Sequence, residues 1–122
     1  TEIACAAISS GCIPSHNVTL AIKDYQQTFE DAYRARNQFG FLRMWSVHPQ
    51  QIKAIIKAMT PESEKIQLAS EILLTAQQRS WAPISLNDKL YDKASYRYYW
   101  QLLQRAHLSG EKLSTDVQEQ FF

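Results

Sequence analysis

His48 is placed where a side chain could do chemistry, because it follows the apolar stretch 42–47 and directly precedes Pro49. If that stretch is a parallel strand, its carboxyl end is where α/β barrels carry their catalytic groups. His48 can equally be the N-cap of a helix that starts at Pro49. Both roles fit the spacing.

Asp92 has two similar interpretations. It precedes an apolar-periodic stretch that ends at Gly110, so its carboxylate can accept a backbone hydrogen bond as an N-cap. The same carboxylate could act as a general acid or base if it reached an active site. Position alone favours the capping role.

No sequence-local catalytic motif accompanies these residues. With three glycines the chain has no phosphate-cradling loop, and it has no GxSxG, no HExxH and no metal-type Cys/His spacing. His16, His48 and His107 are too scattered to indicate a metal site. Cys5 and Cys12 are expected to be free thiols, because two cysteines in 122 residues do not resemble a disulfide scaffold.

The run 96–100 mixes tyrosine, arginine and tryptophan, and Arg105 follows it. Cations and aromatics together can form a platform for single-stranded nucleic acid. On a helix, however, these aromatics point in several directions, so the pattern favours packing against a partner surface.

Composition limits the classes of partner. The chain has room for one domain with a moderate core, and its net charge of +1 gives no argument for nucleic acid or an anionic membrane. No apolar run approaches the roughly 18–20 residues that span a bilayer. No signal peptide is visible, so we expect a cytoplasmic protein without nucleic-acid or membrane partners. The start at Thr1, without methionine, suggests a piece of a larger polypeptide.

Periodicity and cap residues predict the elements that must position His48 and Asp92. We expect helices over 2–9, 25–38 (capped by Asp24 and closed by Gly40), 49–59, 61–79, 93–109 and a last turn from Thr115, with strands over 17–22 and 42–47 and a loop over 84–91. The inward residues should include Tyr25, Phe29, Ala32, Tyr33, Ile52, Ile55, Ile56, Met59, Ile66, Ala69, Ile72, Leu73, Ala76, Ala94, Tyr98, Leu102, Leu103 and Ala106.

The two expected strands, 17–22 and 42–47, are separated by one helix, which predicts parallel pairing and a right-handed crossover. Both are apolar on both faces, so two of them cannot form a stable sheet alone. The missing neighbouring strands must come from a further part of the same polypeptide or from another subunit.

Two segments resemble a known family. Gly40-Phe41, the strand, and the stretch 47–52 (VHPQQI) look like the "GF…IHPxQI" signature of the citrate lyase β-subunit-like aldolases and lyases, which include the malyl-CoA lyases. The stretch 87–92 (NDKLYD) resembles the "DGKMID" segment of that family. The resemblance runs to about Gly110.

The resemblance implies an α/β fold in which this chain is the C-terminal part of a (β/α)8 TIM barrel. Residues 1–60 would hold the last two parallel strands with their helices. Residues 61–122 would be a C-terminal helical extension for oligomerisation and active-site covering, in a homo-oligomer where it contacts a neighbouring subunit.

The family cleaves or forms carbon–carbon bonds on hydroxyacyl substrates, CoA thioesters among them, with Mg²⁺ polarising oxygens. By resemblance, Asp92 would be the catalytic acid/base acting in trans, and His48 and Gln51 would bind substrate. The metal ligands would lie upstream, with none in this chain. The alternative is a non-catalytic helical assembly module derived from that family.

The chain departs from the family pattern in three respects. The metal ligands and the family's substrate-binding arginine come from strands that these residues do not include. The lysine usually found four positions before the histidine is Met44, beside Arg43, and the glycine of "DGK" is Asp88. These changes put CoA recognition and the loop conformation in question and point to a divergent branch.

Overall fold

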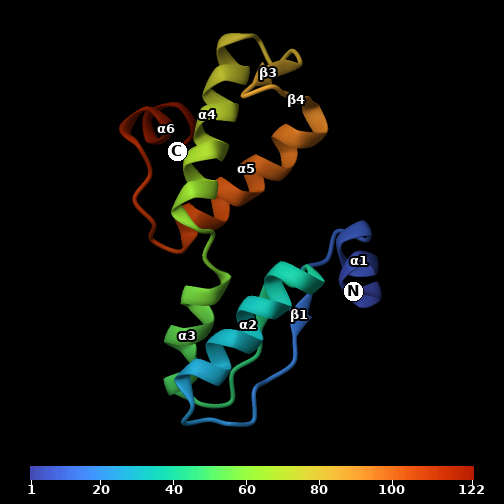
Figure 1. The fold of residues 1–122 in the computed structure, drawn as a ribbon, viewed down its shortest axis with the longest axis vertical. Coiled ribbons are helices and arrows are strands. Elements are labelled where there is room, and N and C mark those ends of the chain that lie inside the picture. The colour runs from blue at the N-terminus through green and yellow to red at the C-terminus, as the bar shows by residue number, and fades with distance from the viewer. The chain divides into compact units, whose positions relative to one another are not determined.

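The computed structural model describes all 122 residues and divides them into two compact units, Thr1–Thr60 (unit 1) and Pro61–Phe122 (unit 2). The division lies at the boundary expected from the sequence, while the roles assigned to the two ranges stay predictions. In Figure 1, unit 1 runs from blue to green and unit 2 from green to red.

Unit 1 contains three helices and a pair of very short strands. Its elements are α1 (Glu2–Ser9), β1 (Ser15–His16), α2 (Tyr25–Phe39), β2 (Arg43–Met44) and α3 (Pro49–Met59). The caps of α2 are as expected, because the Asp24 side chain accepts from the Gln27 N–H at 3.0 Å. At the other end Gly40 has φ +76°, a left-handed conformation that glycine adopts without steric cost.

The two strands pair in parallel, as predicted, with Ser15 opposite Arg43 and His16 opposite Met44. Both strands are shorter than expected. β2 lies within the expected range 42–47, whereas β1 comes before the expected range 17–22. Neither 17–22 nor 42–47 is a buried strand, and Trp45 is 67% exposed. The physical reason is that the backbone beyond His16 has no third strand to pair with, and a side-chain amide bonds the Thr19 carbonyl instead.

Helices α2 and α3 pack against each other through small residues. Ala32 of α2 and Ala58 of α3 form a buried cluster with Ile55. The predicted inward face of α3 is therefore wrong by part of a turn, because Ile52 and Ile56 are exposed. The buried face of α2 is also narrower than predicted, since Tyr25 and Tyr33 are exposed. Close approach of the two helix backbones favours alanine at the contact.

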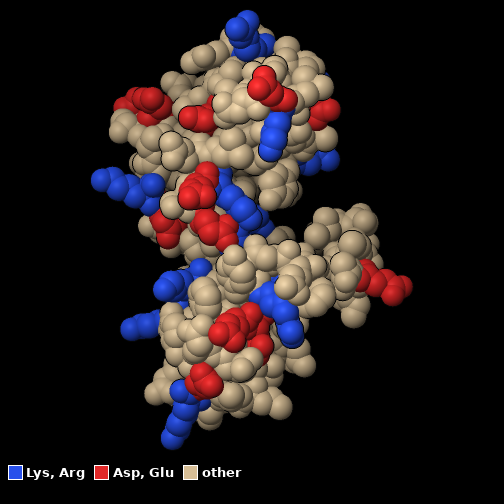
Figure 2. Space-filling view, in the orientation of Figure 1, with Lys and Arg blue, Asp and Glu red and all other residues tan.

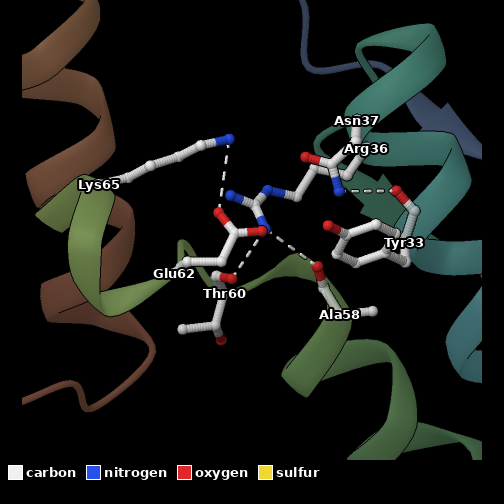
Figure 3. Close-up of polar contacts among 7 residues, drawn as sticks. All are labelled: Tyr33, Arg36, Asn37, Ala58, Thr60, Glu62 and Lys65. Carbon is white, nitrogen blue, oxygen red and sulfur yellow. Dashed lines mark hydrogen bonds and ion pairs between the residues drawn. The ribbon is translucent and has the colours of Figure 1, made fainter.

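The carboxyl end of α3 is held by an arginine of α2 (Figure 3). Nη1 of Arg36 donates to the carbonyl oxygens of Ala58 at 3.3 Å and Thr60 at 2.9 Å. These carbonyls belong to the helix end, where no intrahelical donor is left. The figure also shows Asn37 donating to the Tyr33 carbonyl one turn back in α2, at 2.9 Å.

Unit 2 is a helical unit with one small hairpin. Its elements are α4 (Ser63–Gln78), β3 (Ile84–Leu86), β4 (Lys89–Tyr91), α5 (Lys93–Leu108) and α6 (Thr115–Phe121). Its core joins all of these elements, and the buried residues expected in α4 are confirmed. The fully buried members of that core include Ala69, Ile72, Leu73, Ala76, Leu102, Leu103, Ala106 and Val117.

Three predictions for the helices of unit 2 were wrong. Helix α4 begins at Ser63 rather than Pro61, because Thr60 closes α3 and donates its hydroxyl to the Ile56 carbonyl at 2.7 Å. On α5, Tyr96 is buried whereas Tyr98 and Ala94 are exposed. The N-cap of α6 is Ser114, one residue before the expected Thr115.

The expected loop over 84–91 is an antiparallel hairpin. Ile84 pairs with Tyr91 and Leu86 with Lys89, and the two connecting residues have positive φ, +50° at Asn87 and +62° at Asp88. A two-residue connection with both residues left-handed is the type I′ turn, whose twist matches that of the strands. The fold is thus mixed, mainly helical with few strands.

Candidate functional site

His48 lies where the chain leaves β2 and enters α3. It is the N-cap of α3, and its Nδ1 accepts a hydrogen bond from the Gln50 N–H at 3.2 Å. In the neutral ring, an accepting Nδ1 places the proton on Nε2. The side chain is partly exposed, so Nε2 can donate to a bound group.

Gln51 is placed differently from His48. Its side chain is only 1% exposed, and both ends of its amide are engaged. Nε2 donates to the Thr19 carbonyl at 2.7 Å, while Oε1 accepts from the Val47 N–H at 3.0 Å and from the Ser46 hydroxyl at 3.3 Å. The amide therefore joins the chain after β1 to the chain after β2.

Thr19 extends this network to α2. Its hydroxyl donates to Asp31 Oδ2 at 2.7 Å, and Asp31 Oδ1 accepts from Gln27 Nε2 at 2.9 Å. The segment after β1 is thus held by two side chains, Gln51 of α3 and Asp31 of α2. Nothing in the spacing of Thr19 and Asp31, twelve residues apart, marked them as partners before the structure was known.

Large apolar side chains lie exposed beside this network. They are Leu20, Trp45 and Val47, which all follow the strands, and Leu20 reaches 84% exposure. Exposed apolar groups gathered at one end of a sheet indicate a surface that packs against further protein. At the carboxyl end of the strand pair, the two segments are therefore hydrogen-bonded to each other through Gln51, and their exposed side chains are apolar.

Asp92, in unit 2, is the N-cap of α5, directly after the hairpin. Its Oδ1 accepts from the Ala94 N–H at 3.0 Å and the Ser95 N–H at 3.3 Å, with the Ser95 hydroxyl at 3.5 Å. All of these contacts end on the same oxygen. The residue is exposed, and none of these cap contacts uses Oδ2.

Tyr96 supports the backbone around Asp92 and was not anticipated. Its hydroxyl contacts the carbonyl oxygens of Ala82 at 2.6 Å and Tyr91 at 3.2 Å, and the residue is 5% exposed. Burial raises the pKa of Tyr96 above 10.0, a backbone contact with Ile84 lowers it in part, and the charge of Asp92 raises it. Tyr96 therefore stays protonated at neutral pH and can donate to these carbonyls.

An apolar pocket of about 430 Å³ opens beside Tyr96. It is lined by Leu73, Trp81, Tyr96, Arg97, Trp100 and Phe121. This volume is in the range of small-molecule sites. The lining contains neither a carboxylate nor a histidine, so the pocket can hold an apolar group but offers no general base at neutral pH.

The residues predicted for the site fall into both units. His48 and Gln51 lie one helical turn apart in unit 1, and Asp92 lies in unit 2.

No group of three or more His, Cys, Asp or Glu side chains is arranged to hold a metal ion. No helix is long and apolar enough to cross a membrane. On the face in Figure 2, acidic and basic side chains are interspersed within each unit.

No protein-family model matches the chain, and no curated protein matches it. Several solved structures match the chain. A citrate lyase from Burkholderia xenovorans LB400 is 47% identical, with a TM-score of 0.76 over 99% of this chain and 38% of that one. CitE from Mycobacterium tuberculosis, solved in complex with magnesium, acetoacetate and coenzyme A, is 26% identical, with a TM-score of 0.68 over 84% of this chain and 38% of its own. The chain thus spans less than half the length of either neighbour.

Proposed function

Because the chain belongs to the citrate lyase β-subunit-like family, corresponding to a C-terminal portion of its members, we propose that it is part of a carbon–carbon lyase. The observation that carries this proposal is the 47% identity to a citrate lyase over 99% of the chain. An identity of this size, maintained along the whole chain, supports a shared overall chemistry more strongly than a shared fold alone would.

In this proposal unit 1 contributes the last two strands of a (β/α)8 barrel. The isolated pair of β1 and β2 supports that assignment, because two parallel strands with two paired residues each need further strands for stability. The exposed Leu20 and Trp45 would then pack inside the completed barrel or against its covering loops. His48 would lie at the carboxyl end of the strands, the catalytic face of such barrels.

Asp92 is proposed as the acid/base, delivered to the site of a neighbouring subunit in a homo-oligomer. Its geometry supports this, since Oδ1 carries the capping bonds and Oδ2 can take or give a proton. The hairpin and the Tyr96 hydroxyl fix the backbone just before it, which helps to position the carboxylate. His48 would bind substrate through Nε2.

Magnesium would supply electrostatic stabilisation of the charge that develops on a carbonyl oxygen. The side chains of this chain do not form a site for it, so its ligands would come from the part of the relatives' length that the chain does not span. The substrate is proposed to be a hydroxyacyl compound, with a CoA thioester as the form to test first, because the CitE neighbour was solved with coenzyme A. We propose a cytoplasmic location.

The experiment is a cleavage assay on the complete polypeptide. Hydroxyacyl-CoA thioesters are supplied with Mg²⁺, and the acyl-CoA product is followed by chromatography. Activity that is lost with EDTA and restored by Mg²⁺ is the expected result. An intact, folded polypeptide that cleaves none of the hydroxyacyl substrates, free or as thioesters, would refute the proposal.

A second candidate is a non-catalytic helical assembly module. The observation that favours it is the exposure of large apolar side chains on unit 2, Leu90, Tyr98 and Leu108. Such side chains suit contact with another protein surface. A complete polypeptide that forms a defined oligomer by light scattering, yet lacks lyase activity with every substrate above, would favour this function.

A further inference from the structure

We infer that Gln51 is a positioning residue that holds His48 and does not itself bind substrate. This inference rests on the proposed function for what His48 binds, but its geometry is independent of that function. It replaces the substrate-binding role expected for Gln51 from the resemblance.

The amide of Gln51 is buried, and each of its two ends is hydrogen-bonded. It is 1% exposed, its Nε2 has the Thr19 carbonyl at 2.7 Å, and its Oε1 has the Val47 N–H at 3.0 Å. Because the side chain is buried, a substrate could reach this amide only by moving apart the segments that cover it, which would break one or more of these bonds. That would leave a buried backbone group without its partner, which costs more than the new bond returns.

The Gln51 amide joins two segments that follow different strands. Thr19 lies after β1 and Val47 lies after β2, 28 residues later in the sequence, where no backbone ladder connects the two segments. The Gln51 side chain therefore takes the place of ladder bonds at the carboxyl end of the strand pair. A shift between the segments would break at least one of its bonds.

The Gln51 bridge also supports the turn that carries His48. Val47, whose N–H donates to Gln51 Oε1, directly precedes His48 in the chain. The Ser46 hydroxyl lies 2.8 Å from the His48 carbonyl and 3.3 Å from Gln51 Oε1, so it supports the same turn. The Gln51 N–H also donates to the His48 carbonyl, at 3.0 Å. Backbone and side chain of Gln51 thus fix the loop from which the imidazole projects.

The test uses the complete polypeptide with four variants. Gln51→Leu removes both ends of the amide, and Gln51→Glu keeps the acceptor but removes the donor to Thr19. Ser46→Ala is a milder change at an exposed residue, which the fold should tolerate even if it does not tolerate the Gln51 substitutions. Gln50→Leu is the matched control, because Gln50 is exposed and its side chain has no part in the bridge.

Two measurements need no catalysis. Hydrogen exchange of the segment 45–48 should become faster in Gln51→Leu, and the ring signals of His48 in a histidine-labelled sample should shift, with His16 and His107 as internal references. With active enzyme, KM should rise about tenfold while kcat changes less, since the loss of one hydrogen bond is worth roughly that factor. Ser46→Ala should shift the same signals by less, and Gln50→Leu should shift none.

The outcomes separate this inference from the proposed function. Altered exchange and His48 signals in a protein that cleaves no substrate support the positioning role and refute the lyase. Unchanged exchange at 45–48 and unchanged His48 signals in folded Gln51 and Ser46 variants overturn the positioning role, whatever the activity. A raised KM with undisturbed His48 signals also overturns it, because it would show that Gln51 contacts substrate directly.

Discussion

At the scale of single residues, Asp92 shows how one carboxylate can serve two roles. Its Oδ1 is committed to the first turn of α5, and its Oδ2 is not part of the cap. The capping and acid/base interpretations, which compete when only the sequence is known, are therefore compatible in the structure. Substitutions can separate them, because asparagine caps a helix about as well as aspartate but cannot exchange a proton.

We expect Asp92→Asn in the complete polypeptide to lower kcat by about 100-fold or more, the usual contribution of a general acid or base. Its midpoint of thermal unfolding should stay near that of the parent protein. Asp92→Ala should lower both kcat and the free energy of unfolding, the latter by about 1 kcal/mol.

The control for Asp92 is Asp24→Asn, which alters an N-cap with similar geometry on α2. It should change neither activity nor the midpoint of unfolding. Equal activity in Asp92→Asn and the parent protein would leave Asp92 with the capping role alone.

Tyr96 makes the second prediction at this scale. Tyr96→Phe removes the hydroxyl that contacts the Ala82 and Tyr91 carbonyls, so the free energy of unfolding should fall by about 1–2 kcal/mol. Tyr98→Phe is the matched control, since Tyr98 is exposed on the same helix. Urea unfolding followed by circular dichroism measures both. A loss as large in Tyr98→Phe would contradict the assigned partners.

At the scale of elements, the hairpin accounts for one departure from the family pattern. Asp88 stands where the family's segment has glycine, and the structure gives this position a φ of +62°. Left-handed backbone is easy for glycine and costly for other residues, although aspartate tolerates it better than most. Asp88 therefore makes the turn less stable than glycine would at the same position.

Replacing Asp88 by glycine should accordingly raise the free energy of unfolding by about 0.5–1 kcal/mol. Asp88→Val should lower it, because a β-branched side chain is strained at positive φ. Thermal unfolding of both variants measures the difference. If Asp88→Gly were less stable than the parent, the turn would not be the type I′ turn described above.

The elements also show what could be read from the sequence. Helix ends marked by Asp24, Gly40, His48 and Asp92 were predicted well, because capping is a local interaction between near neighbours. The strands and inward faces were predicted less well, since they depend on partners distant in sequence. The hairpin had a local signal, a two-residue Asn-Asp connection between alternating residues, and it was missed for lack of the usual glycine.

For the candidate site the same contrast holds. His48 and Gln51 could be singled out from a short motif, but the role of Gln51 depends on Thr19, which is 32 residues away. Tyr96 could not be singled out, because four aromatics lie in the run 96–100 and only the fold decides which one is buried. Tyr96 can be buried because its hydroxyl meets two carbonyl oxygens, those of Ala82 and Tyr91.

At the scale of the whole molecule, the two units differ in how much core they contain. Unit 2 has thirteen buried core residues from every one of its elements, whereas the cluster of unit 1 has three, two of them alanines. Apolar burial is the main favourable term in folding, so unit 2 has the better claim to independent stability.

Residues 61–122 expressed alone should therefore unfold cooperatively on heating, and residues 1–60 expressed alone should not. Circular dichroism at 222 nm with a temperature ramp makes the comparison. Fragments of near-equal length act as controls for each other, since chain length alone sets a similar limit on both. Cooperative unfolding of 1–60 alone would show that its few strands and helices are sufficient without further strands.

The parallel pair of β1 and β2 has a practical consequence. Each strand has a neighbour on one side only, so the outer side of each presents backbone donors and acceptors to any extended peptide nearby. Concentrated solutions of this chain should consequently form intermolecular β-structure and precipitate. A short peptide with the sequence of the strand that would lie next to β1 or β2 in the proposed barrel should keep the chain in solution.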